Sequence, residues 1–143
     1  MAYSDIPGYV EYLDLNHRYY VVIALKKELE DSLFDCHFFD DEGDIKDGFE
    51  GFWFNEKVFL LMEKYLFNYI DDECKLIITM YEEEYIFPEK LRQALEITNR
   101  QILAVEKDAD KIPDAKVFLE TAGKIKALIE KAIELDTVVG FCF

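Results

Sequence analysis

The spacing of hydrophobic residues along the chain changes from that of a strand to that of a helix and back. Residues 9–15 alternate apolar and polar side chains, which is typical of a strand. Asn16 is a residue type that caps helices, and the apolar positions after it recur at helical spacing. These positions are Val22, Leu25, Leu29, Leu33 and Cys36. We therefore predict a helix over residues 16–33.

The middle of the chain has the composition of further strands and one helix. Residues 35–40 (DCHFFD) and 49–54 (FEGFWF) are predicted as short strands, with an acidic loop between them. Asn55 is a predicted N-cap. The helix after it would carry Val58, Leu61, Met62, Tyr65 and Tyr69 on one side. The β-branched, apolar residues 74–81 predict a central strand.

The last third of the chain predicts two amphipathic helices and a final strand. Pro88 starts the first helix, whose buried stripe is Leu91, Ala94, Leu95, Thr98, Ile102 and Val105. A loop over residues 106–114 follows, and Asp114 opens the second helix, which buries Phe118, Ala122, Ile125, Ile129 and Ile133. Residues 137–143 (TVVGFCF) predict a strand. This order indicates one α+β domain over residues 1–143, with a mixed or antiparallel sheet and about four helices.

Length and composition indicate a globular cytoplasmic protein. The chain has 143 residues, of which 51% are hydrophobic and 15% aromatic, enough for a core without metals or disulfides. Three widely spaced cysteines, Cys36, Cys74 and Cys142, are typical of reduced, buried thiols. The first residues lack the pattern of a signal peptide, and the longest apolar run is too short to span a membrane. We expect a monomer or weak dimer.

Acidic residues are concentrated in the first two thirds of the chain. The net charge is −15, and residues 1–50 hold 13 acidic and 4 basic residues, whereas residues 91–143 hold 9 and 8. Such a chain repels nucleic-acid backbones and anionic membranes, so we expect neither as a direct partner. It is suited to rapid association with a basic protein.

Three acidic triads recur within this part of the chain. They are Asp40, Asp41 and Glu42, then Asp71, Asp72 and Glu73, then Glu82, Glu83 and Glu84. One interpretation is that they are solvated turns and strand ends. The other is that the fold gathers them into one electronegative patch, where a cationic partner would relieve their mutual repulsion.

Motifs for catalysis, metals and cofactors do not fit this chain. A calcium loop starting at Asp40 would place Ile45 where glycine is required and Gly51 where a glutamate is required. His17 and His37 are the only histidines, and neither has a zinc-type spacing with the cysteines. No nucleophile elbow, P-loop or dinucleotide fingerprint is present. We expect no cofactor and no enzymatic activity.

The stretch from Phe38 to Phe54 is the strongest candidate for a partner-binding surface. Its carboxylates are Asp40, Asp41, Glu42, Asp44, Asp47 and Glu50, and the aromatics Phe49 and Trp53 follow them. Trp53 is either a core residue or an interface anchor, because both environments favour tryptophan. Asp71, Asp72, Glu73, Glu82, Glu83 and Glu84 complete the predicted contact set.

The acidic triads, together with two amphipathic helices running into a final strand over residues 87–143, resemble the small acidic immunity proteins of bacterial toxin–immunity pairs. The resemblance implies an α+β domain that binds a cognate toxin, in many pairs a basic nuclease, and blocks its active site. Two alternatives remain open on the residues alone. One is a DNA mimic that inhibits a nucleic-acid-binding enzyme, and the other is a small cytosolic adaptor.

Overall fold

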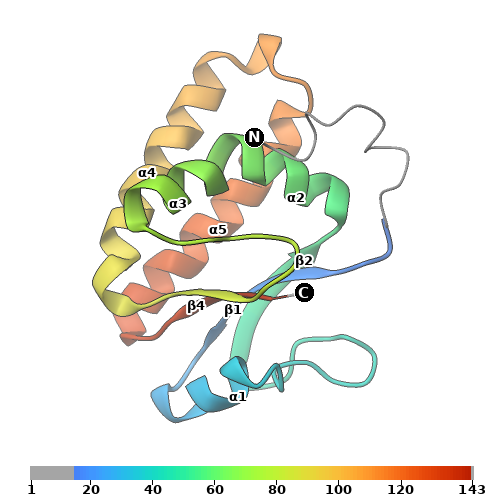
Figure 1. Ribbon diagram of the computed structural model, residues 1–143, viewed down its shortest axis with the longest axis vertical. Helices are drawn as coiled ribbons and strands as arrows, with labels where there is room; N and C mark the ends of the chain where they lie inside the picture. Colours follow the sequence, from blue (N-terminus) through green and yellow to red (C-terminus); the bar gives the residue numbers. More distant parts are fainter. Residues whose placement is uncertain (1–14, 143) are drawn as a thin grey trace.

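The computed structural model describes residues 15–142, and their four strands form one antiparallel sheet in the order β2-β1-β4-β3 (Figure 1). The strands are β1 (Tyr19–Ala24), β2 (Phe49–Phe54), β3 (Glu84–Ile86) and β4 (Val139–Cys142). Tyr19 is paired with Phe54 in β2, and Tyr20 with Cys142 in β4. The expected α+β class is confirmed, and the sheet is the antiparallel one of the two forms anticipated.

Helices and connecting loops form the rest of the described chain. They are α1 (Glu30–Phe34), the continuous series α2 (Glu56–Met62), the π-helical η4 (Glu63–Phe67) and α3 (Asn68–Cys74), and the long pair α4 (Pro88–Lys107) and α5 (Ala115–Leu135). Short 3-10 turns precede α1 (η3, Lys27–Leu29) and α5 (η5, Ala109–Lys111). The helix starts expected at Pro88 and after Asp114 are confirmed, as is the terminal strand.

The sheet has a large helical layer on one face and a small cover on the other (Figure 1). Alternate residues of β1, Tyr19, Val21 and Ile23, belong to the main core with α2 to α5. Tyr20 and Val22 point to the opposite face, where they pack with Leu33, Phe38 and other residues of α1 and the loop after it. We call the first the helix face and the second the loop face.

The helix predicted over residues 16–33 is wrong in its first half, because residues 19–24 form a central strand. All six side chains of β1 are buried, on both faces of the sheet. A run buried on both faces does not alternate, so its spacing cannot be told from that of a buried helix. The β-branched and aromatic composition of Tyr19 to Ile23 was the signal for a strand. The strand expected over residues 9–15 lies outside the described residues except for Leu15.

Two other predicted strands are wrong. Residues 74–81 do not join the sheet, since Cys74 ends α3 and Lys75 closes that helix in the left-handed conformation. The N–H groups of Ile77 and Ile78 donate to the carboxylates of Glu84 and Asp71 instead of to a neighbouring strand. Residues 35–40 contain only an isolated bridge from Phe39 to Ile45.

Asn55 caps α2 as predicted, but the buried side of the following helices differs from the predicted one. The Oδ1 atom of Asn55 accepts a hydrogen bond from Val58 N–H at 3.1 Å. The buried residues include Phe59, Leu60, Leu66, Phe67 and Ile70, whereas Tyr69 is exposed. A π-helical turn takes more residues than an α-helical turn, so η4 rotates the buried stripe away from the simple 3.6-residue pattern.

Candidate functional site

Residues 38–46 form a tight hairpin whose tip carries the first acidic triad. Asp40 N–H donates to Asp44 O at 2.8 Å, and Lys46 N–H donates to Phe38 O at 2.9 Å. One carboxylate oxygen of Asp40 accepts from the N–H groups of both Glu42 and Asp44, at 2.9 Å each. The carboxylates of residues 40, 41, 42 and 44 are exposed. We call residues 40–44 the acidic loop.

Two side chains, Arg18 just before β1 and Tyr20 within it, hold the acidic loop against the sheet. The carbonyl of Gly43 accepts a hydrogen bond from Arg18 Nη1 at 3.0 Å and from the Tyr20 hydroxyl at 2.6 Å. Gly43 has φ +84°, a conformation that glycine adopts at little cost. The ring of Tyr20 also stacks on Phe39, with an interplanar angle of 6°. The loop therefore has a defined position relative to the sheet.

Trp53 lies next to the acidic loop and is not a core residue. Its side chain is 44% exposed, and the Arg18 guanidinium carbon lies 4.4 Å from its ring centroid. Arg18 therefore contacts both Trp53 and the loop carbonyl of Gly43. Arg18 thus connects Trp53 to the backbone of the acidic loop. The sequence analysis grouped these two features only by their position in the chain.

The remaining predicted residues of this stretch have different environments. Asp47 is exposed, and Phe49 is half-buried against Phe38 on the loop face. Glu50 points to the helix face, where its carboxylate pairs with Lys131 of α5 at 2.9 Å. The sheet thus separates Glu50 from the acidic loop.

The second and third triads meet at the opposite edge of the sheet. Asp71 and Glu84 accept hydrogen bonds from consecutive N–H groups, those of Ile78 at 3.0 Å and Ile77 at 2.8 Å. Burial raises the pKa of Asp71 to about 7, the Ile78 N–H opposes this, and the negative charge of Glu84 adds to it. These two carboxylates organise the segment between α3 and β3.

The other residues of these triads lie around that segment. Glu73 forms an ion pair with Arg100 of α4, and its backbone carbonyl accepts from Gln93. Glu83 accepts from the Cys36 thiol at 3.4 Å, while Asp72 and Glu82 are exposed. Two hydrophobic side chains between the triads are also exposed, Ile77 at 65% and Tyr81 at 60%. The triads therefore form two groups, one beside β1 and β2 and one beside β3.

The carboxylates of Asp40, Glu42 and Asp44 are the nearest approach to a cation site among the described residues. Their oxygens lie within 4.8 Å of one another, and all three side chains are exposed. Oxygen ligands suit calcium and magnesium, but one oxygen of Asp40 already accepts hydrogen bonds from two backbone N–H groups.

The thiols of Cys36 and Cys142 are poor nucleophiles, because a raised pKa keeps them protonated. Burial and the neighbouring Glu83 raise the pKa of Cys36 to about 11, and burial also raises the pKa of Cys142.

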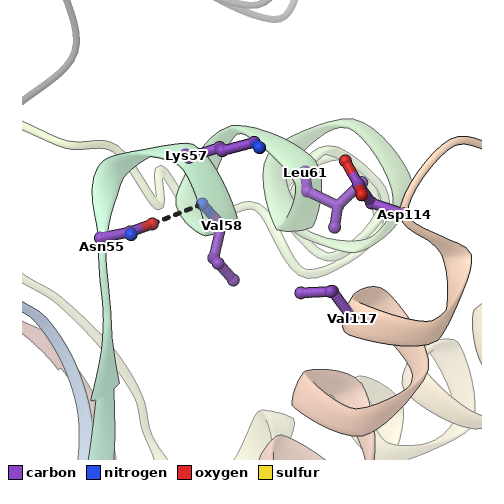
Figure 2. Close-up of a pocket in the computed structure, with 6 residues that line it drawn as sticks. All are labelled: Asn55, Lys57, Val58, Leu61, Asp114 and Val117. Carbon is purple, nitrogen blue, oxygen red and sulfur yellow. Dashed lines mark hydrogen bonds between the residues drawn. The ribbon is translucent and has the colours of Figure 1, made fainter. Parts of the chain in front are cut away.

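A small hollow lies between the start of α2 and the start of α5 (Figure 2). Asn55, Lys57, Val58, Leu61, Asp114 and Val117 line a volume of about 160 Å³. The amide oxygen of Asn55 is engaged in capping α2. Ligand pockets commonly have about 300–1,000 Å³, so this hollow is small for a substrate or cofactor. We assign it no role.

Comparison with protein-family models, with curated proteins and with solved structures gives no match for this chain. Within residues 15–142, no helix has both the length and the apolar character needed to cross a membrane.

The sequence analysis did not identify Arg18 and Tyr20 as residues of the candidate site. Both lie in the stretch that was wrongly predicted as a helix. In a strand, successive side chains point to opposite faces, and only this geometry places residues 18 and 20 together on the face that meets the acidic loop.

Proposed function

We propose that the protein binds and inhibits a basic protein partner, a nuclease-type toxin, through the acidic loop and Trp53. The observation that carries this proposal is that Arg18 contacts both the exposed Trp53 and the backbone of the acidic loop, which carries four exposed carboxylates. Fixing a contact surface in advance lowers the entropy lost on binding. Tryptophan is enriched among the residues that dominate binding energy at interfaces.

The proposed mechanism is occlusion of the partner's active site and requires no catalysis by this chain. The net charge of −15 attracts a basic partner, and the acidic loop would meet lysines and arginines that otherwise hold phosphates. Trp53 would become buried in the contact and slow dissociation. Asp47 and the group at Asp71, Asp72, Glu73, Glu82, Glu83 and Glu84 would act at longer range, through the charge they add.

The test compares two variants with equal net charge. In the first, Asp40, Asp41 and Asp44 become Asn and Glu42 becomes Gln, which keeps the side-chain oxygen that Asp40 uses in the turn. In the second, Glu89, Glu96 and Glu106 of α4 become Gln and Asp110 becomes Asn, all exposed positions. The partner is the basic protein captured from the native cell, and the signal is the fluorescence of Trp53, the only tryptophan.

The loop variant should associate about tenfold more slowly or worse at low ionic strength, and the difference should shrink as salt screens the charges. The α4 variant should lose much less, because its neutralised groups lie outside the contact. Equal rates for the loop variant and the unaltered protein would refute the assignment of the acidic loop. If the captured partner were instead a DNA-binding enzyme, and its DNA substrate released it from this protein, the result would favour a DNA mimic.

A further inference from the structure

Strand β2 forms one edge of the sheet, and within residues 15–142 its only strand partner is β1. Leu25 N–H donates to Gly48 O at 2.8 Å and continues the β1–β2 ladder by one pair. Hydrogen-bonded pairs alternate along an antiparallel ladder, so Phe49, Gly51 and Trp53 direct their backbone groups away from β1. Phe49 N–H is engaged in a turn with Lys46 O. The remaining outward groups have no strand partner within the part of the chain that the structure describes, so another strand can pair on this edge.

A groove of about 370 Å³ runs beside this edge, between β2 and α5 on the helix face. Phe52, Ala127 and Leu128 supply its apolar surface, and Lys124 and Lys131 lie along it. Lys131 pairs with Glu50, and the Lys124 ammonium lies 5.4 Å from the ring centroid of Phe52. The edge therefore combines a backbone that can pair, an apolar groove, and charges of both signs.

We infer that this edge binds a second copy of the same chain, with β2 pairing antiparallel to β2 across a two-fold axis at Gly51. A two-fold pairing of two β2 strands must place the outward backbone groups of one copy opposite those of the other. Among the pairings that do so, the one centred on Gly51 pairs the greatest length of β2. This pairing places Glu50 of one copy opposite Phe52 of the second copy. Lys124 of the second copy lies over the ring of that Phe52, so Glu50 comes to lie beside it. This charge complementarity occurs twice, once on each side of the axis.

The same pairing places Phe49 opposite Trp53 of the second copy on the loop face. Aromatic pairs directly across antiparallel strands stabilise strand pairing. The contact is narrow, so the dimer is weak, with a dissociation constant on the order of 100 µM. Two chains of net charge −15 repel each other, so added salt should strengthen the dimer. Because Trp53 takes part in both contacts, self-association and partner binding should compete.

The competing explanation is that Lys124 and Lys131 keep the edge from pairing, as lysines do at many edge strands. Complementary charge variants separate the two. In a Lys124→Glu homodimer, Glu50 of each copy meets a glutamate. In a Glu50→Lys homodimer, each new lysine meets Lys124. In the mixed dimer both contacts again join opposite charges.

The experiment is sedimentation equilibrium of the full chain up to about 1 mM, at about 0.02 and 0.5 M salt. We expect the unaltered protein to dimerise at high salt, each variant alone to be at least about tenfold weaker, and their equimolar mixture to recover the dimer. The control is Lys126→Glu, the same charge change on α5 but two residues further along, and so turned away from Lys124. It should dimerise normally.

Thermal melts of all variants show whether each one is folded. A protein that stays monomeric under every condition would overturn the inference. It would mean that Lys124 and Lys131 prevent pairing at this edge, or that a different protein binds there. A dimer that neither variant weakens, or a mixture that fails to recover it, would place the contact elsewhere. Since the measurement uses this chain alone, its result is independent of whether a toxin partner exists.

Discussion

The guanidinium of Arg18 stacks on Trp53 and at the same time donates a hydrogen bond to the carbonyl of Gly43. A guanidinium can do both, because its flat face lies over the ring while the N–H groups at its rim stay available as donors. One side chain therefore fixes the acidic loop and the neighbouring tryptophan in one arrangement. The proposed contact surface depends on Arg18 although the residue itself has the wrong charge for a basic partner.

Replacing Arg18 with alanine should loosen the acidic loop. The amides of Gly43 and Asp44 are hydrogen-bonded within the loop, and without Arg18 we expect them to exchange with solvent about tenfold faster or more. Hydrogen exchange measured by NMR checks this, with Arg92→Ala, an exposed site on α4, as the control. Unchanged exchange at both amides would mean that Tyr20 alone holds the loop.

Two glycine substitutions should change stability in opposite directions. A Cβ at Gly51 would overlap Val21 O and lie 2.8 Å from Val22 Cα, so β1 and β2 would have to separate. A Cβ at Gly123, inside α5, has no atom of residues 15–142 within 4 Å, apart from those of α5 itself. We expect Gly51→Ala to lower the free energy of unfolding by about 2–4 kcal/mol. Gly123→Ala should raise it by about 0.5–1 kcal/mol through helix propensity.

Urea unfolding of the two glycine variants measures both changes. A Gly51→Ala protein as stable as the original would show that the close approach of the two strands is easily relaxed. A destabilised Gly123→Ala protein would show that this position of α5 has a neighbour after all.

Asp71 should make stability depend on pH near neutrality. Its pKa is about 7 in the folded protein and about 3.9 in an unfolded chain, so between these values the folded state binds more protons. Stability therefore falls as pH rises through this window. Asp71→Asn removes the charge but keeps an oxygen for Ile78 N–H. We expect it to raise the melting temperature by roughly 3–6 °C at pH 8 and by much less at pH 5.

Melting curves across this pH range check the prediction for Asp71. The matched control is Asp72→Asn, because Asp72 is the next residue in the chain and its carboxylate is exposed. An Asp71→Asn gain that is the same at pH 5 and pH 8 would argue against titration of this group. A loss at both pH values would mean that the carboxylate is worth more as a hydrogen-bond acceptor than its charge costs.

The sequence predicted best those elements whose ends carry their own signals. Pro88 and Asn55 start helices for local reasons, through the missing N–H of proline and the capping amide, so tertiary contacts had little to add. The class of fold followed from these elements and the strands at residues 49–54 and 137–143. The conformation of residues 74–81 could not be predicted this way. Its amides bind side chains from Asp71 and Glu84, a choice that depends on where α3 ends and β3 begins.

The candidate site was predictable in composition and not in geometry. Clustered carboxylates marked the acidic loop, and an exposed position of Trp53 was one of two open interpretations. Arg18 and Tyr20 carry no local signal, because their role comes from the pairing of β1 with β2 and from a loop that returns beneath them. The same pairing put Glu50 on the helix face, away from the other carboxylates of its segment.

Strand β4 lies between β1 and β3, so residues 139–142 complete the centre of the sheet. While a ribosome is still adding α5, β1 has β2 but lacks β4, and β3 lacks the strand with which it pairs among the described residues. The nascent chain can form the α4–α5 helical hairpin early, but the sheet must wait for residues more than a hundred positions downstream of β1. Contacts of this sequence separation slow folding, because the long loop must close before they form. We therefore expect the newly made protein to depend on chaperones until β4 is inserted.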